Sequence, residues 1–240
     1  DRFELSYTDE FDELNVSARC GAAWFSRTPW NGDFGDARFA DPAPGFPFLI
    51  EKGVLRIEAS RDVAGRWSSG LLSARDSCRK GFAQRYGYFE IRAMLPEGAG
   101  FWPAFWLIGV NTERFTAELD VFEHHGHSPS TFVTTMHVHP WAKDVARVNV
   151  GHVTEVKPGL LSERFNTWGV EIGETDTVVY FNRREVWRFP TPPELRQPMY
   201  PLINLALDLG FATPDTPEKA FMYVDYFRAY SRKPESDASR

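Results

Sequence analysis

Residues 118–123 read Glu-Leu-Asp-Val-Phe-Glu, three acids set among apolar residues. Successive side chains of a strand point to opposite faces, so Glu118 and Asp120 share one face and Glu123 falls on the other. One extra residue at Val121-Phe122, a β-bulge, returns Glu123 to the face of the other two acids and turns the phenylalanine towards the core. The pattern therefore predicts a bulged strand with three carboxylates on one open face.

The flanks of this strand bear on what the acids do. Residues 102–106, Trp-Pro-Ala-Phe-Trp, precede it, His124-His125-Gly126 follows it, and no Lys or Arg occurs from residue 115 to residue 142. A solvent-facing strand whose acids are merely solvated is the simpler interpretation. Carboxylates concentrated without cationic partners raise one another's pKa, however, which lets a neutral acid and an ionised nucleophile coexist near neutral pH.

Composition limits the class of protein. The chain has 240 residues, a length that suits one large all-β domain or two small ones. Its net charge of −6 argues against binding to nucleic acid or to an anionic membrane surface, since both need a basic face. The aromatic content of 15% exceeds what a core alone requires and indicates a β-rich core, platforms for sugars, or both.

Segments with the alternation of strands recur along the chain, and little helix is predicted. They are residues 3–12, 53–59, 67–74, 86–95, 101–108, 116–123, 132–139, 165–172, 178–181, 185–188, 199–207 and 221–230. Because no break in composition separates them, residues 1–232 are predicted to be a single domain and residues 233–240 a polar tail. Many strands without long linkers predict one all-β antiparallel sandwich, with a groove on its concave face lined by the acid strand.

From residue 20 to residue 48 the sequence is dense in Trp, Gly, Pro and Asp without a period. This predicts a long ordered loop, and such loops are often functional. Trp24, Trp30, Asn31 and Asp33 are its candidate substrate contacts, with core packing an equal alternative for each Trp.

Trp102 and Trp106 share one strand face and are predicted to floor the groove, because pyranose rings stack on indoles. His137, expected on the strand beside the acids, would hydrogen-bond Asp120 or a sugar hydroxyl, or be a satisfied half-buried histidine. Weaker candidates for the groove are Trp67, Trp141 and Arg75.

Histidines and cysteines raise the question of metals and redox state. The spacing of His124, His125, His127, His137 and His139 matches no common zinc motif, so no metal or other cofactor is expected in catalysis.

The two cysteines, Cys20 and Cys78, form either a buried reduced pair or one disulfide, which would indicate an oxidising compartment. The chain begins at Asp1, as a processed or a recombinant fragment does, which is compatible with export, and no signal peptide is expected within it. A secreted or periplasmic location is expected.

The acid strand resembles the Glu-x-Asp-x-x-Glu signature of glycoside hydrolase family 16, in the bulged form of its laminarinase-like members. The resemblance extends from about residue 3 to residue 231, and its specificity is high. The further stretches that carry it are Ser69-Gly70, residues 86–92 (Tyr-Gly-Tyr-Phe-Glu-Ile-Arg), Leu95-Pro96, residues 102–107 (Trp-Pro-Ala-Phe-Trp-Leu), residues 204–206 (Asn-Leu-Ala) and residues 224–230 (Val-Asp-Tyr-Phe-Arg-Ala-Tyr).

This resemblance implies a β-jelly-roll of two curved antiparallel sheets with a concave substrate groove. It implies a retaining hydrolase that cleaves internal β-1,3 or β-1,4 bonds, or both, of a polysaccharide, and we expect it to act as a monomer. By position, Glu118 resembles the nucleophile, Asp120 the assisting carboxylate and Glu123 the acid/base. A sugar-binding sandwich without hydrolysis, of the lectin kind, and a transglycosylase are the alternatives.

Two finer expectations follow from the same resemblance. Many family members hold a structural calcium ion on the convex side, and Asp225 stands where one ligand would be, with backbone oxygens of Gly53 and of a residue near Glu10 as partners. Residues 33–36 and 45–48 resemble those of bacterial endoglycanases that act on mixed-linkage β-glucan or process exopolysaccharides. Lichenases lack the bulge, and the usual Gly-Gly after Asn-Leu-Ala is absent here.

Overall fold

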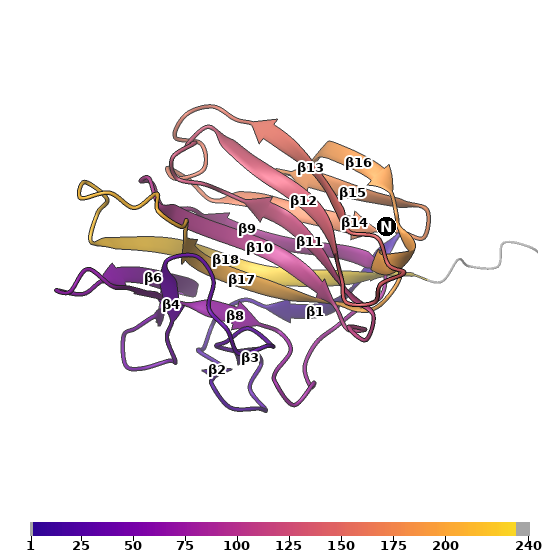
Figure 1. Cartoon of the computed structure of the whole chain (residues 1–240), viewed down its shortest axis with the longest axis horizontal. Coiled ribbons are helices and arrows are strands. Elements are labelled where there is room, and N and C mark those ends of the chain that lie inside the picture. The colour runs from indigo at the N-terminus through magenta and orange to yellow at the C-terminus, as the bar shows by residue number, and fades with distance from the viewer. Residues whose placement is uncertain (1, 234–240) are drawn as a thin grey trace, which may run out of the picture.

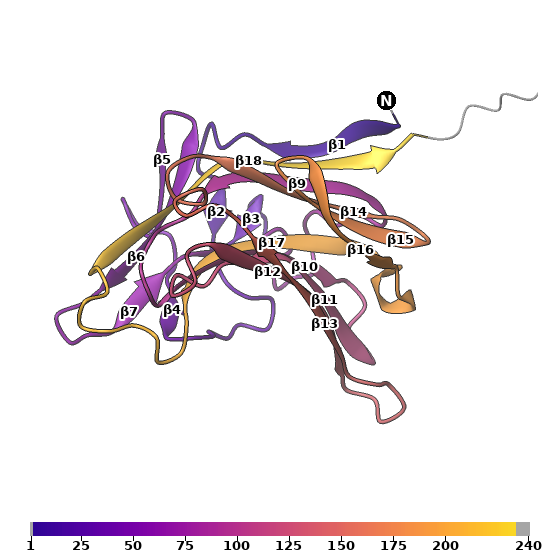
Figure 2. The same cartoon turned by 90° about the horizontal axis from the view of Figure 1, so that it is seen from above.

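The alternating segments form strands, and the strands assemble into two sheets packed face to face (Figure 1 and Figure 2). The computed structural model describes residues 2–233; of the expected polar tail, residues 234–240 lie outside the described residues. Within residues 2–233 the only helix is the 3₁₀ turn η1 at Pro193–Leu195, which confirms the all-β prediction. No helix in this part of the chain is long and apolar enough to cross a membrane.

One sheet has ten strands and the other has eight. In order across the ten-stranded sheet lie β16 (Arg184–Pro190), β15 (Asp176–Phe181), β14 (Asn166–Ile172), β9 (Gly87–Met94), β18 (Lys219–Arg232), β6 (Val54–Arg61), β7 (Trp67–Ser69) and β4 (Ala37–Phe39), with β1 (Phe3–Asp9) paired to β18 and β5 (Phe48–Glu51) to β6. In order across the eight-stranded sheet lie β13 (Val148–Glu155), β12 (Thr131–Pro140), β11 (Phe115–Glu123), β10 (Phe101–Gly109), β17 (Met199–Leu207), β8 (Leu71–Ser73), β3 (Trp24–Phe25) and β2 (Val16–Ser17).

The pairing is antiparallel except in two short pairs, β2 with β3 and β4 with β7. The expectation of purely antiparallel sheets is therefore wrong at these two sheet edges. Both exceptions involve strands of two or three residues. Strands that approach an edge from a loop, rather than from a hairpin, have no constraint on their direction.

The core fills the space between the sheets with the inward side chains of each strand. Phe105 on β10 contacts Phe227 on β18, with ring centroids 6.0 Å apart. Phe122 on β11 contacts Trp168 on β14 in the same way, at 4.4 Å. All four side chains are fully buried, so aromatic contacts across the two layers hold the sandwich together.

The predicted bulge lies at Val121-Phe122. Asp120 of β11 pairs with Thr135 of β12, and Glu123 of β11 pairs with Val133 of β12. Two residues of β11 therefore lie between these pairs where β12 has only one. The register with β10 shifts at the same point. The bulge prediction is confirmed, and the buried Phe122 is the side chain that the bulge turns inward.

Residues 67–74, predicted as one strand, form two strands in different sheets. The chain passes from β7 to β8 at Gly70, where it runs close against the core. A Cβ atom at Gly70 would lie 2.6 Å from the Phe48 ring and 2.9 Å from a methyl carbon of Ile57. Only glycine fits at this crossing without moving its neighbours, and this tertiary constraint is invisible in the alternation of the sequence.

Strand β13 was not among the predicted strands. It forms the edge of the eight-stranded sheet, and Val150 and Val153 are about half exposed there, at 50% and 57%. Two apolar residues three apart on one exposed edge do not give the period-two pattern that signals a half-buried strand.

The predicted long loop at residues 20–48 is ordered, and it also contributes β3 and β4. It covers part of the outer face of the eight-stranded sheet, where Phe34 packs edge-on against Trp106 at 5.9 Å. At Gly35, φ is +65°, and a Cβ atom would lie 2.0 Å from the carbonyl oxygen of Leu207. The glycine thus lets the loop lie directly against β17.

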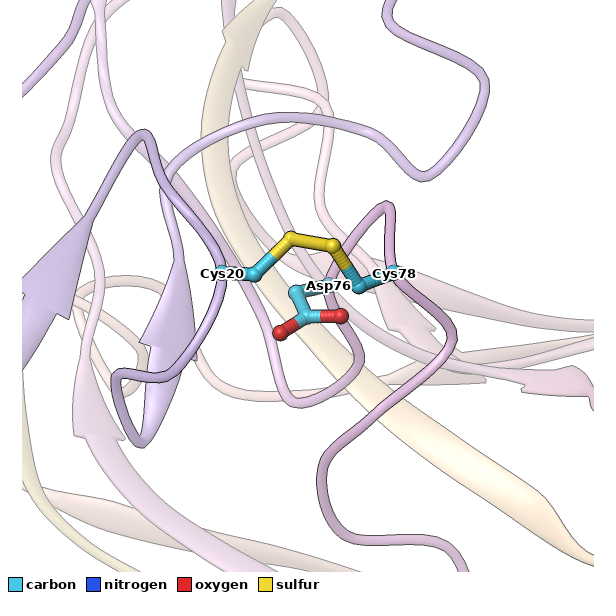
Figure 3. Close-up of side chains that lie close together, drawn as sticks. All are labelled: Cys20, Asp76 and Cys78. Carbon is cyan, nitrogen blue, oxygen red and sulfur yellow. A yellow bond between two sulfur atoms is a disulfide. The ribbon is translucent and has the colours of Figure 1, made fainter.

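Cys20 and Cys78 form a disulfide, with their Cα atoms 6.1 Å apart. Figure 3 shows the carboxylate of Asp76 beside this bond. The carboxylate accepts hydrogen bonds from the backbone N–H groups of Gly21 (3.1 Å) and Lys80 (3.0 Å). The disulfide and this buried acid together join the long loop to the segment after β8.

Removal of the disulfide should destabilise the fold. The bond links residues 58 positions apart. Closing a loop of this size lowers the entropy of the unfolded chain and so adds about 2–4 kcal/mol to the free energy of unfolding. We expect the variant C20S/C78S to lose free energy of unfolding of this size in urea titrations, and the reduced wild type to behave like it. An unchanged unfolding midpoint in both samples would contradict this account.

Candidate active site

Glu118, Asp120 and Glu123 line one cavity of about 190 Å³ on the outer face of the eight-stranded sheet. The register with β10 shows the effect of the bulge, because Glu118 lies opposite Ile108 and Glu123 lies opposite Ala104. The two glutamates are therefore four strand steps apart, about 13 Å along the backbone, with their side chains on the same face. The remaining residues that line this cavity are Trp30, Phe34, Trp102, Ala104, Trp106 and Asn204.

The three acids differ in burial, and burial shifts the pKa values of two of them, Asp120 and Glu123. The side chain of Glu118 is 21% exposed and that of Asp120 is 6% exposed. Burial raises the pKa of Asp120 well above its usual range, and the charges of Glu118 and Glu123 raise it further. Burial also raises the pKa of Glu123, the charge of His125 lowers it in part, and Glu118 raises it again. Both shifts favour the protonated forms of Asp120 and Glu123.

Trp102 contacts the carboxylate of Glu123 directly. Its indole N–H donates a hydrogen bond of 3.2 Å to Glu123 Oε1, and the hydroxyl of Thr135 donates one of 3.5 Å to Oε2. The ring of His125 stacks on the indole at 5.6 Å, and Phe34 packs against it edge-on. Trp102 lines the cavity as predicted, but it offers its N–H group to an acid while neighbouring rings cover its faces.

Two histidines on β12 face the other two acids. His137 Nε2 lies 3.3 Å from Asp120 Oδ2, and His139 Nε2 lies 3.3 Å from Glu118 Oε2. His137 thus lies beside Asp120 as expected, but Asp120 Oδ2 has no hydrogen-bond partner among the described residues, so the hydrogen bond between them stays a prediction. Ligand-type atoms of His137, Glu118 and Asp120 all lie within 4.8 Å of one another. Burial lowers the pKa of His137, so its imidazole is neutral at neutral pH.

A second histidine pair, missed by the sequence reasoning, lies on the Glu123 side of the cavity. His125 Nδ1 is 2.7 Å from Asp208 Oδ2, and His127 Nδ1 is 3.5 Å from the same oxygen. The hydrogen bond to Asp208 raises the pKa of His125. Because 83 residues separate the two partners, no local signal in the sequence could have paired them.

The other predicted tryptophans behave differently from one another. Trp106 is 5% exposed, and its indole N–H donates to Asn204 Oδ1 at 2.7 Å, so it forms the floor of the cavity. Trp30 is 54% exposed and lies 6.1 Å from Trp106. Trp30 is therefore the open platform, and Trp106 supports the floor beneath it.

Trp24 and Asn31 do not reach the acids. Trp24 is fully buried and its indole N–H donates to Asp9 at 2.7 Å, so the prediction of a substrate contact is wrong and core packing is correct. Asn31 accepts a hydrogen bond of 3.4 Å from Arg27 and lines a separate hollow that it shares with Asp33. Neither Asn31 nor Asp33 lines the cavity that holds the three acids.

A larger cavity of about 1130 Å³ adjoins the first, since Trp30 and Glu118 line both. Two of the weaker candidates, Trp141 and Arg75, line it as well. The third, Trp67, is buried against Phe101 and belongs to the core. The groove thus extends from the acids along the Glu118 side.

The predicted calcium ligands have other partners. The carboxylate of Asp225 accepts a hydrogen bond of 2.5 Å from Arg92, and that of Glu10 accepts two of 2.8 Å from Arg228. A calcium ion at Asp225 would meet a guanidinium already in place, and Gly53 offers only backbone oxygen. These side chains do not fit an open calcium site, and the ion remains a prediction from the resemblance alone.

Comparison with known proteins gives the family. The profile of Glycosyl hydrolases family 16 matches residues 53–227. The endo-1,3-1,4-β-glycanase EglC of Rhizobium meliloti is 33% identical over 94% of this chain and 51% of its own length. The endo-1,3-1,4-β-glycanase ExsH of the same species is 32% identical over 96% of this chain and 53% of its own length. The chain thus spans about half the length of these two relatives.

A solved structure gives the fold. The catalytic domain of an endo-1,3-β-glucanase (laminarinase) from Thermotoga petrophila superposes with a TM-score of 0.76 at 23% identity. The match covers 97% of this chain and 99% of that domain, which confirms the predicted jelly-roll. With the family profile matching well over half of its residues, the chain belongs to glycosyl hydrolase family 16.

Proposed function

We propose that this chain is a retaining, endo-acting β-glycanase that cleaves internal β-1,3 or β-1,4 bonds of a β-glucan or a bacterial exopolysaccharide. The observation that carries the proposal is the bulged strand, which gathers Glu118, Asp120 and Glu123 in one cavity with graded burial. The family, and two relatives named endo-1,3-1,4-β-glycanases, support it.

In the first step, the carboxylate of Glu118 bonds to the anomeric carbon while Glu123 gives its proton to the departing oxygen. Burial and the charge of Glu118 raise the pKa of Glu123, so the proton is available. Esterification then removes the charge of Glu118, and the pKa of Glu123 falls. In the second step, Glu123 accepts a proton from water, which attacks the same carbon and releases Glu118.

Asp120 assists the nucleophile. Its carboxyl is the most deeply buried of the three and its pKa is raised well above the usual range, which favours its protonated form. A protonated Asp120 is a hydrogen-bond donor for Glu118 once the two side chains approach, since one carboxylate oxygen of each lies within 4.8 Å of the other. This bond orients the nucleophile and weakens as the ester forms.

A sugar-binding sandwich without hydrolysis is the less favoured alternative. Burial of acids costs free energy, and a binding site for neutral sugars gains nothing from three carboxyls that repel one another. A transglycosylase would use the same residues. The two enzymes differ in their products, because a transglycosylase forms oligosaccharides longer than its substrate. Mass spectrometry would detect these longer products.

We also expect the protein to work outside the cytoplasm, secreted or periplasmic, as a monomer. The disulfide between Cys20 and Cys78 supports an oxidising compartment. Fractionation of the native host tests the location, and a cytoplasmic protein would overturn that expectation. Sedimentation of the purified protein tests the oligomeric state, and a stable dimer would overturn the monomer.

Substitution of either glutamate should abolish turnover without loss of the fold. We expect Glu118→Gln and Glu123→Gln to lower release of reducing ends by about a hundredfold to ten-thousandfold, with unchanged melting temperature. The substrate panel is laminarin, mixed-linkage β-glucan, agarose and acidic bacterial exopolysaccharides. Glu185→Gln, on the other sheet, is the matched control. Near-normal hydrolysis by either variant sinks the assignment.

Azide separates the two roles. In Glu118→Gly, azide can occupy the face of the missing nucleophile and form an α-glycosyl azide. In Glu123→Ala, azide attacks the covalent intermediate from the opposite face and forms a β-glycosyl azide. The reverse pattern would exchange the two roles.

The pH dependence should respond to His125 and Asp208. The general acid must be protonated, so activity is lost as pH rises through the pKa of Glu123, which the charge of His125 lowers. Loss of that charge should therefore move the alkaline limb of kcat/KM to higher pH. We expect this shift in His125→Gln and in Asp208→Asn, which lowers the pKa of His125. The double variant should match His125→Gln; additive shifts, or none, contradict the coupling.

The ion pairs at Asp225 and Glu10 predict that chelation has no effect on stability. We expect the melting temperature to be the same in EDTA and in millimolar calcium. A melting temperature that falls in EDTA, recovers with calcium and loses this response in Asp225→Asn would instead establish the site implied by the resemblance.

A further inference from the structure

The larger cavity, on the Glu118 side of the active site, has a lining unlike that of the smaller one. Its walls come from three segments: residues 75–79, which the disulfide tethers, residues 110–113 between β10 and β11, and residues 141–147 after β12. The smaller cavity holds acids and aromatic rings. The larger one adds three arginines, Arg75, Arg79 and Arg147.

Arg75 is fixed in the wall. Its guanidinium donates hydrogen bonds of 3.3 Å to the backbone oxygens of Arg79 and Val110, and it lies over the ring of Tyr200 at 5.7 Å. These contacts satisfy part of its hydrogen-bonding capacity, and within residues 2–233 the guanidinium of Arg75 forms no salt bridge.

Arg79 and Arg147 are exposed and available. Among residues 2–233, no carboxylate oxygen lies within 4.0 Å of either guanidinium. Arg147 Nη1 lies 3.4 Å from His139 Nδ1, and the other ring nitrogen of His139 faces Glu118. Arg147 is thus one side chain away from the proposed nucleophile, at the end of the cavity nearest the chemistry.

Three acids, Asp76, Glu113 and Glu118, line the same cavity and balance its formal charge, but they are placed differently from the arginines. Asp76 is 6% exposed and its oxygens accept backbone N–H groups. Glu118 lies at the inner end, beside His139. Of the described lining residues, Glu113 is the one exposed acid, whereas Arg79 and Arg147 are both exposed. Two guanidinium groups and one carboxylate are therefore exposed in this cavity, in a chain whose net charge is −6.

Two exposed indoles complete the cavity. Trp30 is 54% exposed and Trp141 is 66% exposed, and both line it. Indole faces stack on the apolar faces of sugars, and guanidinium forks bind carboxylates through paired hydrogen bonds. An uncharged glucan can stack on the indoles but offers no carboxylate to the arginines.

Given the proposed function, we propose that this cavity is a subsite for a sugar unit that carries a carboxylate, recognised by Arg79 and Arg147. The preferred substrate is then an anionic β-glycan, with its carboxylate either on the backbone sugar or on a substituent. Arg75 contributes charge from the wall, and Trp30 and Trp141 hold the ring.

A matched pair of polymers tests the subsite. The probes are mixed-linkage β-glucan and the same glucan with part of its 6-hydroxyl groups oxidised to carboxylates, so that linkage is held constant. The quantity measured is the ratio of kcat/KM for the oxidised polymer to that for the neutral one. We expect Arg79→Gln and Arg147→Gln each to lower this ratio by up to about fivefold, as exposed charge pairs do, and added salt to lower it in the wild type.

Controls separate the subsite from general effects. Arg184→Gln, on β16 in the other sheet, should leave the ratio as in the wild type. Arg147→Lys keeps the positive charge and should give a ratio between those of the wild type and Arg147→Gln. A ratio that neither arginine variant changes, or that Arg184→Gln changes equally, overturns the subsite while the neutral glucan is still cleaved. If the wild type cleaves neither polymer nor any member of the wider panel, the proposed function itself fails.

Discussion

The site depends on one conflict within strand β11, which must bury apolar side chains on one face and present carboxylates on the other. A regular strand can do this for Glu118 and Asp120 but not for Glu123. The bulge resolves the conflict by inserting one extra residue into β11. Phe122 then packs against Trp168 in the core, which offsets the loss of regular pairing. The same distortion therefore serves both the stability of the sandwich and the alignment of the acids.

The surroundings of the three acids divide the cavity electrostatically. On one side His137 and His139 lie beside Asp120 and Glu118, and on the other Asp208 holds His125 near Glu123. Burial dominates the pKa of both Asp120 and Glu123, and the neighbouring charges adjust it. Similar carboxyl groups on one strand can in this way hold different protonation states.

Features set by local sequence were predictable, and features set by distant contacts were not. The strand alternation and the bulge follow from neighbouring residues, and the structure contains both of them. The alternation could not reveal that the chain changes sheets at Gly70, because the obstacle is another strand. Trp24 has the same composition signal as Trp30, and only the fold makes one of them core. Asp208 reaches His125 across 83 residues, so a single sequence gives no sign of the pair.

The loop that carries Trp30 is anchored on both sides of that residue. Before Trp30, the disulfide and the pairing of β3 with β8 secure the loop, and after it the backbone N–H of Asp36 donates a hydrogen bond to Leu207. The entropy cost of closing a loop grows only logarithmically with its length. The span between these anchors, which carries Trp30, can thus gain or lose residues at little cost to the sandwich. Evolution or engineering can alter what the cleft accepts there while the catalytic strand stays untouched.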